Sequence, residues 1–157
     1  SHVTRLLHEL LFTPPQSSGT SLTTALHFLN NLLQRRALVF VLSDFHDASG
    51  TDWQRALAAT HQRHEVIALR TVDQRELVLP DVGLALVQDA ETGEVMEIDT
   101  GDPEVRAAWA SMGEQRQRDL IATFRRSRVP ELEVRTDQPW PQRLQKFLDY
   151  SAKRRVA

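Results

Sequence analysis

Apolar residues recur along this chain with two alternating periods, one typical of amphipathic helices and one typical of strands. A spacing of three to four residues predicts helices that begin near residues 3, 21, 52, 103 and 141. Short apolar runs predict strands over residues 37–42, 66–69 and 132–134. Helices and strands therefore alternate, which is the order typical of an α/β protein with a parallel sheet.

Two details refine this pattern. Residues 37–42 are continuously apolar, which predicts a strand buried on both faces of the sheet. Residues 84–87 and 95–98 flank a turn that contains Gly93, which predicts a β-hairpin inserted between the second and third parallel strands. The expected fold is a partial doubly wound, Rossmann-like parallel sheet with an inserted β-hairpin, formed by a single domain over residues 1–157.

Composition narrows the classes of function. The chain has 41% hydrophobic residues, 25% charged residues and a formal net charge of -2. No nucleic-acid partner is expected, because binding to a polyanion requires a surplus of clustered cations. The absence of cysteine excludes disulfides and thiolate metal sites. No apolar run approaches the ~20 residues that span a bilayer, so we expect no membrane contact by this segment and a cytoplasmic location.

Hydroxyl and carboxylate side chains follow each predicted parallel strand. Ser43 and Asp44 follow the first strand, Thr71 and Asp73 the second, and Thr136 and Asp137 the third. Because the carboxyl ends of parallel strands meet at one edge of a sheet, these oxygens are expected to gather there. They suit a hard divalent cation such as Mg²⁺. The same residue types are also common as helix caps and turn formers, which is the alternative interpretation.

Two segments taken together point to a family. Gly19-Thr20-Ser21-Leu22, and then residues 38–45 with the sequence LVFVLSDF, resemble the later half of a von Willebrand factor A domain. More narrowly, the chain resembles the C-terminal part of a bacterial family of uncharacterised proteins that carry such a domain and are encoded beside MoxR-type AAA+ ATPases. Residues 65–70, 79–83, 91–95 and 136–137 extend this resemblance.

The resemblance implies a von Willebrand A-type fold with a metal-ion-dependent adhesion site. In this chain, it assigns Thr20 and Asp44 as metal ligands, with Ser43 and Asp47 as possible neighbours. The D-x-S-x-S motif of such a site does not occur in the chain. We therefore expect weak binding of Mg²⁺ or Mn²⁺, and we expect the missing motif and the N-terminal strands of a truncated domain to precede residue 1. The parent protein of such a family can be membrane-anchored.

The favoured function is a non-catalytic protein-interaction module that works with a MoxR-type AAA+ ATPase in the assembly or maturation of other proteins. The chain lacks a glycine-rich phosphate loop, a G-x-S-x-G elbow and an H-E-x-x-H motif. The alternative is a metal-dependent phosphoryl hydrolase that uses strand-end carboxylates, namely Asp44, Asp47, Asp73 and Asp137.

The absence of the first strands also predicts self-association. The strand over residues 37–42 would have an unpaired apolar edge, which favours pairing with another chain. The helix over residues 21–35 would expose Leu26, Leu29 and Leu33. We therefore expect a homo-oligomer that forms through this strand, through this helix, or by exchange of the N-terminal helix.

Overall fold

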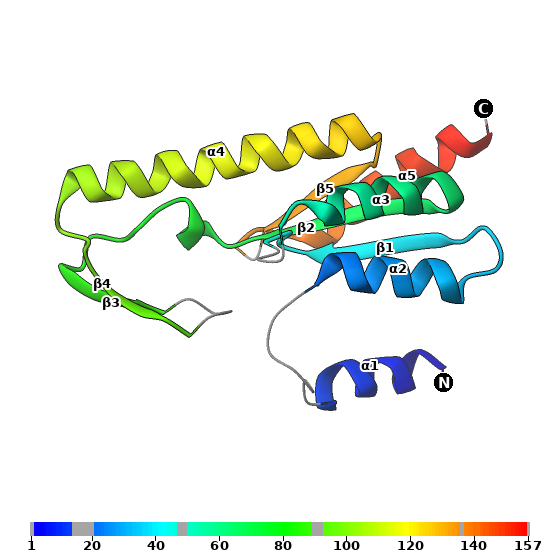
Figure 1. The fold of residues 1–157 in the computed structure, drawn as a ribbon, viewed down its shortest axis with the longest axis horizontal. Helices are drawn as coiled ribbons and strands as arrows, with labels where there is room; N and C mark the ends of the chain where they lie inside the picture. The colour runs from blue at the N-terminus through cyan, green and yellow to red at the C-terminus, as the bar shows by residue number, and fades with distance from the viewer. Residues whose placement is uncertain (1, 14–20, 47–49, 89–92, 136, 157) are drawn as a thin grey trace.

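The computed structural model describes residues 2–13, 21–46, 50–88, 93–135 and 137–156 (Figure 1). The helices are α1 (His2–Phe12), α2 (Leu22–Leu32), α3 (Asp52–Arg63), α4 (Pro103–Ser127) and α5 (Trp140–Val156), with a short 3-10 turn, η1 (Gln74–Glu76). The strands are β1 (Leu38–Ser43), β2 (Glu65–Val72), β3 (Leu84–Gln88), β4 (Val95–Asp99) and β5 (Glu131–Arg135). None of the helices in these ranges is both long and apolar enough to cross a bilayer.

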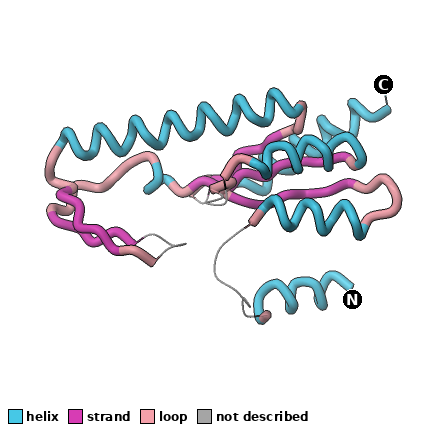
Figure 2. The backbone as a smooth tube through the Cα atoms, viewed as in Figure 1, coloured by secondary structure: helices cyan, strands magenta, loops and turns pink. Residues whose placement is uncertain are grey.

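Two sheets confirm the predicted mixture of α and β structure. The larger sheet has three parallel strands in the order β1-β2-β5, with Val39 beside Val66 and Ala68 beside Glu131. β3 and β4 form an antiparallel pair. Figure 2 shows that this hairpin lies at the amino end of the long helix α4, away from the parallel sheet. The predicted parallel β-α-β unit and the inserted hairpin are both confirmed.

The main core lies between one face of the parallel sheet and helices α2, α3 and α4. Its buried side chains include Leu26, Val39, Leu57, Val66 and Phe124. Ile67 and Leu69, which alternate with the core residues of β2, are buried on the opposite face. The third strand, β5, is in contact with α5. The central strand β2 is therefore buried on both faces, as its continuous apolar sequence predicts.

The same prediction is wrong for β1. Val39 is 6% exposed and packs into the core, whereas Leu38, Phe40 and Leu42 on the other face are 42%, 40% and 67% exposed. In the part of the chain that the structure describes, β1 has one neighbour, β2, and its other edge is open. A continuous apolar run predicts two covered faces only for a strand inside the sheet, and β1 lies at its edge.

The expectation that α2 exposes Leu26, Leu29 and Leu33 is also wrong. Leu26 is 4% exposed, and the other two side chains pack against the core. The helix instead exposes Phe28 and Leu32, and it ends at Leu32 rather than near Arg35. The i, i+4 apolar stripe faces the core because α2 packs against α3.

Helices α2 and α3 share a buried polar contact. The Asn30 side-chain amide donates to Thr60 Oγ at 2.7 Å, and the Thr60 hydroxyl donates to the Ala56 carbonyl at 2.8 Å. Asn30 Oδ1 and both ring nitrogens of the buried His64 have no hydrogen-bond partner among the described residues. This interface therefore depends on one hydrogen bond to satisfy the Asn30 amide.

Thr60→Val is expected to lower the free energy of unfolding by about 1–3 kcal/mol, because it keeps the shape of the side chain and leaves the Asn30 amide buried without an acceptor. The double variant Asn30→Leu/Thr60→Val is expected to recover part of this loss, since neither residue then requires a hydrogen bond. Urea denaturation of the two variants and of Asn30→Leu completes the cycle. Additive losses would show that the two side chains are not coupled.

Gly113 allows the segment around η1 to approach α4 closely. A Cβ atom added at Gly113 would lie 2.6 Å from the Glu76 carbonyl oxygen, and Gly113 is buried in α4. The Trp109 indole N–H on the same helix donates to the Arg75 carbonyl at 3.1 Å. The close backbone approach and the indole bond together hold the start of the hairpin segment against α4.

Gly113→Ala is therefore expected to lower the free energy of unfolding by about 1–3 kcal/mol, because the methyl group would overlap a backbone oxygen that cannot rotate away. In an open helix the same change would raise stability by up to ~1 kcal/mol. The control is Ser111→Ala, at an exposed position of α4, and we expect it to be neutral or slightly stabilising. A stabilised Gly113→Ala variant in thermal or urea unfolding would contradict the close approach.

Candidate functional site at the carboxyl ends of the parallel strands

Asp44 directly follows β1 at the carboxyl edge of the parallel sheet. Ser43 lies beside Arg70 in the register of β1 and β2, so Asp44 is next to Thr71 in the neighbouring strand. Figure 1 shows that the amino end of α2 and the carboxyl end of β1 lie at the same end of the sheet. Asp44 thus lies at the carboxyl edge of the sheet, which is the edge at which open α/β sheets bind their ligands.

The Asp44 carboxylate is held by its own loop. Asp44 Oδ1 accepts the His46 backbone N–H at 3.0 Å, and the Ser43 hydroxyl donates to the same oxygen at 3.4 Å. The Asp44 side chain is 49% exposed, with Oδ2 3.8 Å from His46 Nδ1. One carboxylate oxygen is therefore engaged by the loop, and the other faces the imidazole and solvent, where a cation with its water shell can reach it.

Phe45 has a backbone conformation that is rare for its type. Its φ is 60°, in the left-handed region that disfavours residues with a Cβ atom. The Phe45 ring is 3% exposed and lies 5.4 Å from the ring of Trp53 and 4.9 Å from that of Phe124. The Phe45 N–H also donates to Ser43 Oγ at 2.9 Å. The buried ring keeps the backbone in this conformation, which turns the chain directly after Asp44.

A small hollow lies beside Asp44. Its lining includes Asp44, His46, Arg70, Thr71 and Arg116, and its volume is about 10 Å³, close to what one water molecule needs. Both carboxylate and guanidinium groups face this space. The hollow is therefore too small to hold a hydrated ion, and a cation bound by Asp44 would lie outside it.

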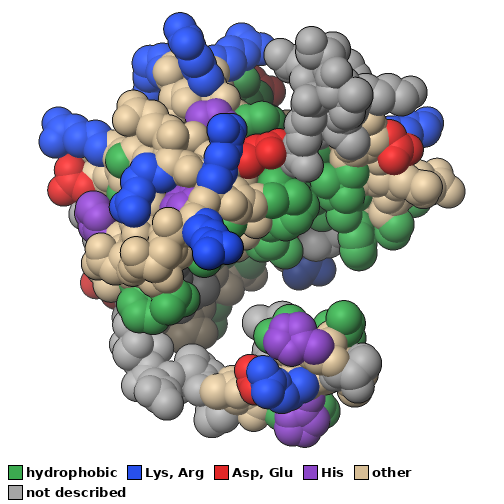
Figure 3. Space-filling view, turned by 90° about the vertical axis from the view of Figure 1, so that its right-hand side faces the viewer, with side chains coloured by type: hydrophobic (Ala, Val, Ile, Leu, Met, Phe, Trp, Pro, Cys, Tyr) green, Lys and Arg blue, Asp and Glu red, His purple; other side chains and the backbone are tan. Residues whose placement is uncertain are grey.

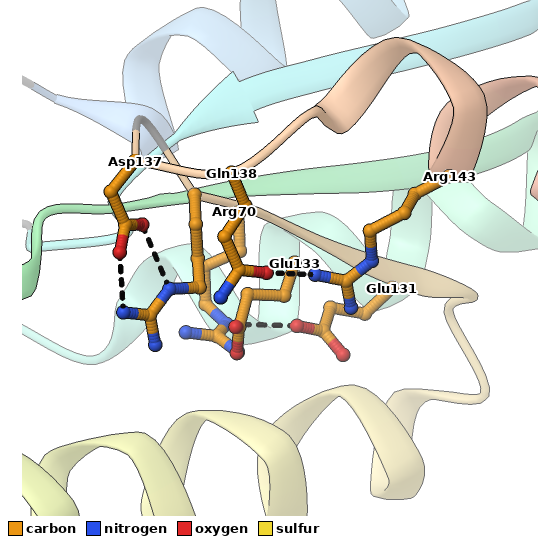
Figure 4. Close-up of polar contacts among 7 residues, drawn as sticks. Arg70, Glu131, Glu133, Asp137, Gln138 and Arg143 are labelled. Carbon is orange, nitrogen blue, oxygen red and sulfur yellow. Dashed lines mark hydrogen bonds and ion pairs between the residues drawn. The ribbon is translucent and has the colours of Figure 1, made fainter.

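Arg70 and two glutamates form a buried charge cluster behind this hollow (Figure 4). Arg70 Nε donates to Glu131 at 2.8 Å, and the second guanidinium nitrogen donates to Glu133 at 2.8 Å. The Arg70 side chain is 2% exposed, and those of Glu131 and Glu133 are 19% and 28% exposed. The cluster joins β2 to β5, and sequence reasoning missed it. The available signal was the alternation of glutamates in residues 131–135, which places both on one face of the strand.

The other strand-end carboxylates have different partners. Arg135 donates two hydrogen bonds of 3.0 Å to the Asp137 carboxylate, which lower the pKa of Asp137 below its ordinary value. Asp73 caps η1 by accepting the Arg75 backbone N–H at 2.9 Å. Within the described ranges no three Asp, Glu or His side chains form a group that could hold a metal ion. The contacts of Asp73 and Asp137 are those of a cap and an ion pair.

Two predicted site residues, Thr20 and Asp47, lie outside the described residues, as does Thr136. The cap of α2 is Ser21, whose hydroxyl oxygen accepts the Thr24 backbone N–H at 3.2 Å. Of the remaining residues, the structure brings Ser43, Asp44 and Thr71 to one edge of the sheet. The proximity of Thr20 and Asp44 stays a prediction.

The fold and this edge define an α/β protein with a three-stranded parallel sheet, an antiparallel hairpin and an exposed carboxylate after the edge strand. The chain belongs to the family "Protein of unknown function DUF58", whose sequence profile matches residues 1–119. No solved structure matches the chain.

Uncharacterised mycobacterial proteins are among the relatives of the chain. The chain is 36% identical over 137 residues to an uncharacterised protein of Mycobacterium avium, a match that covers 86% of this chain and 79% of the relative. It is 34% identical over 141 residues to an uncharacterised protein of Mycobacterium tuberculosis, covering 88% of this chain and 44% of that relative. The match to a protein of Mycobacterium bovis has the same extent. The chain thus spans less than half the length of these last two relatives.

Proposed function

We propose that this chain is a non-catalytic protein-interaction module of the von Willebrand A type, in which Asp44 contributes to a metal-linked contact with a partner protein. The observation that carries the proposal is the position of Asp44. Its carboxylate is half exposed, follows an edge strand at the carboxyl end of a parallel sheet, and is oriented by a loop that Phe45 holds in a left-handed conformation. Membership of the DUF58 family supports the proposal, since the von Willebrand A resemblance was to such a bacterial family.

The proposed metal is Mg²⁺ or Mn²⁺, bound weakly. Asp44 is the ligand on which the proposal rests, Thr20 is the second, and Ser43 and Asp47 are neighbours. A hard cation with one or two protein carboxylates keeps several waters, so its affinity for this chain alone is expected to be of about millimolar order. A carboxylate from the partner would replace one of these waters and link the two proteins through the metal.

The open edge of β1 supports a second part of the proposal, that the complete domain has further strands beside β1. The von Willebrand A resemblance places these strands before residue 1. The Mycobacterium tuberculosis relative, of which the matched region is 44%, is long enough to hold them.

The proposed partner is a MoxR-type AAA+ ATPase, and the proposed process is the assembly or maturation of another protein. The test is binding of this chain to a purified MoxR-type AAA+ ATPase, measured by biolayer interferometry in Mg²⁺ and in EDTA. We expect EDTA and Asp44→Ala each to weaken binding at least about tenfold, as the loss of a metal ligand should.

The matched control is Asp149→Ala, which removes an exposed carboxylate from α5 and is expected to bind like the unaltered chain. Equal binding in Mg²⁺ and EDTA, or unaltered binding by Asp44→Ala, would contradict the metal-linked contact. Turnover of a phosphoryl substrate that disappears in Asp44→Ala would instead establish the hydrolase alternative.

A further inference from the structure

One face of the β3–β4 hairpin carries three exposed apolar side chains and two carboxylates. Leu84, Leu86 and Val95 on this face are 69%, 73% and 57% exposed. Leu84 lies opposite Asp99 and Leu86 lies opposite Glu97 in the antiparallel register, so all five side chains share one face. We call these five residues the hairpin face. An exposed apolar surface of this kind marks an interaction site.

The charge of the chain is divided between the hairpin segment and the rest. Residues 76–105 contain nine Asp and Glu residues and no Lys, Arg or His, whereas the rest of the chain has nineteen Lys and Arg against twelve Asp and Glu. The segment over residues 116–128 alone contains five arginines and one aspartate. Figure 3 views the molecule from the end at which α4 finishes, and Lys and Arg side chains there outnumber acidic ones.

A hollow whose charge is opposite to that of the hairpin lies at the carboxyl end of α4. Its volume is about 310 Å³, and its lining includes the apolar side chains of Ile121, Phe124 and Val129 together with Arg125 and Arg128. Both arginines are exposed, and neither forms an ion pair with a described residue. Glu131 also lines the hollow, but Arg70 holds its carboxylate. The hollow thus offers two guanidinium groups and a small apolar surface, since Phe124 and Val129 in its lining are only 2% and 4% exposed.

We propose that the hairpin face of one molecule docks into the Arg125–Arg128 hollow of a second copy. The two surfaces lie at opposite ends of α4, whose 25 residues span about 37 Å, so one molecule cannot join its own pair. Other elements also expose apolar side chains, but α1 has one Arg and one Glu, and α2 and β1 have no Asp, Glu, Lys or Arg, so none of them has a negative charge to match the hollow. Charge therefore selects the hairpin as the occupant.

This contact is head-to-tail, because the two surfaces differ. Such contacts produce rings or open chains of molecules. A hairpin with five-residue strands buries less than the ~800 Å² per partner of a standard interface, so the association is weak and sensitive to salt. The contact does not involve Asp44 or the open edge of β1, and it is independent of the proposed metal-linked function.

Sedimentation velocity of the full chain tests the proposal with a pair of charge reversals, Glu97→Arg on the hairpin face and Arg125→Glu in the hollow. Each variant alone is expected to associate at least about tenfold more weakly than the unaltered chain, since like charges then meet. An equimolar mixture of the two variants is expected to regain association, because each hairpin then finds a hollow of opposite charge. Leu86→Ser should weaken association with little change of charge.

The control is Asp149→Arg, which makes the same change of charge as Glu97→Arg outside both surfaces, and we expect it to associate normally. Four outcomes would overturn the proposal. The unaltered chain could stay monomeric at low salt and high concentration, or both reversals could leave association intact, as they would if the chains paired through β1. The mixture of the two variants could fail to regain association, or the Leu86→Ser variant could associate like the unaltered chain. Circular dichroism of each variant confirms that it is folded.

Discussion

Replacing Arg70 with methionine is expected to lower the free energy of unfolding by about 3–5 kcal/mol, because it removes the buried cation of an ion cluster. Arg70 is 2% exposed and holds Glu131 and Glu133 at 2.8 Å each. The substitution leaves two carboxylates on one face of β5 without a counter-charge. Equilibrium denaturation in urea at neutral pH measures the loss.

A triple variant separates the loss of the cation from the loss of packing. Arg70→Met/Glu131→Leu/Glu133→Leu removes all three charges and is expected to recover most of the stability, because apolar side chains of similar volume can replace a buried ion cluster. Glu131→Leu and Glu133→Leu alone are expected to cost less than Arg70→Met, since each leaves Arg70 with one carboxylate. An Arg70→Met variant as stable as the unaltered chain would show that the cluster contributes nothing.

Phe45→Ala is expected to lower the free energy of unfolding by about 3–5 kcal/mol, because it removes a buried ring from contact with Trp53 and Phe124. Phe45→Gly is expected to be more stable than Phe45→Ala by about 1 kcal/mol. Glycine adopts a φ of 60° without the steric cost that alanine meets there. At ordinary positions glycine is the less stable of the two, so the reversed order is diagnostic.

The matched comparison is made at Ala110, a helical position of α4 with negative φ. Ala110→Gly is expected to be destabilised by up to ~1 kcal/mol, the usual order of the two residues. If Phe45→Gly were less stable than Phe45→Ala, the left-handed conformation after Asp44 would be contradicted.

Hydrophobic periodicity predicted the helices and strands, because the spacing of apolar residues within a segment reflects the secondary structure of that segment alone. Asp102 and Pro103 begin α4 as predicted, and the Asp102 side chain accepts the Glu104 backbone N–H at 2.8 Å. Strand β2 was predicted over residues 66–69, because Arg70 interrupts its apolar run. The strand in fact continues to Val72. A charged residue inside a strand carries no local signal of the partners that allow its burial, and these partners lie 61 and 63 positions away.

The candidate site was predictable only in part, for a similar reason. Asp44 follows an apolar run, and its position at the edge of a parallel sheet follows from the β-α-β pattern. The left-handed conformation of Phe45 had no signal, since that conformation favours glycine or asparagine and is set here by the burial of the ring between α3 and α4. Whether both faces of β1 are covered depends on the elements that pack against this strand. A run of apolar residues carries no information about those elements.

Titration of the chain with Mn²⁺, followed by ¹H–¹⁵N NMR, tests the central claim most directly, because the paramagnetic ion broadens amide signals near its site. We predict that the signals of Ser43, Asp44, His46 and Thr71 broaden first, with an affinity of about millimolar order, and that Asp44→Asn removes this effect. The acidic hairpin is an internal comparison, since it offers Glu97 and Asp99 away from the carboxyl edge of the parallel sheet. Broadening that begins at the hairpin, or that Asp44→Asn leaves unchanged, would contradict the account.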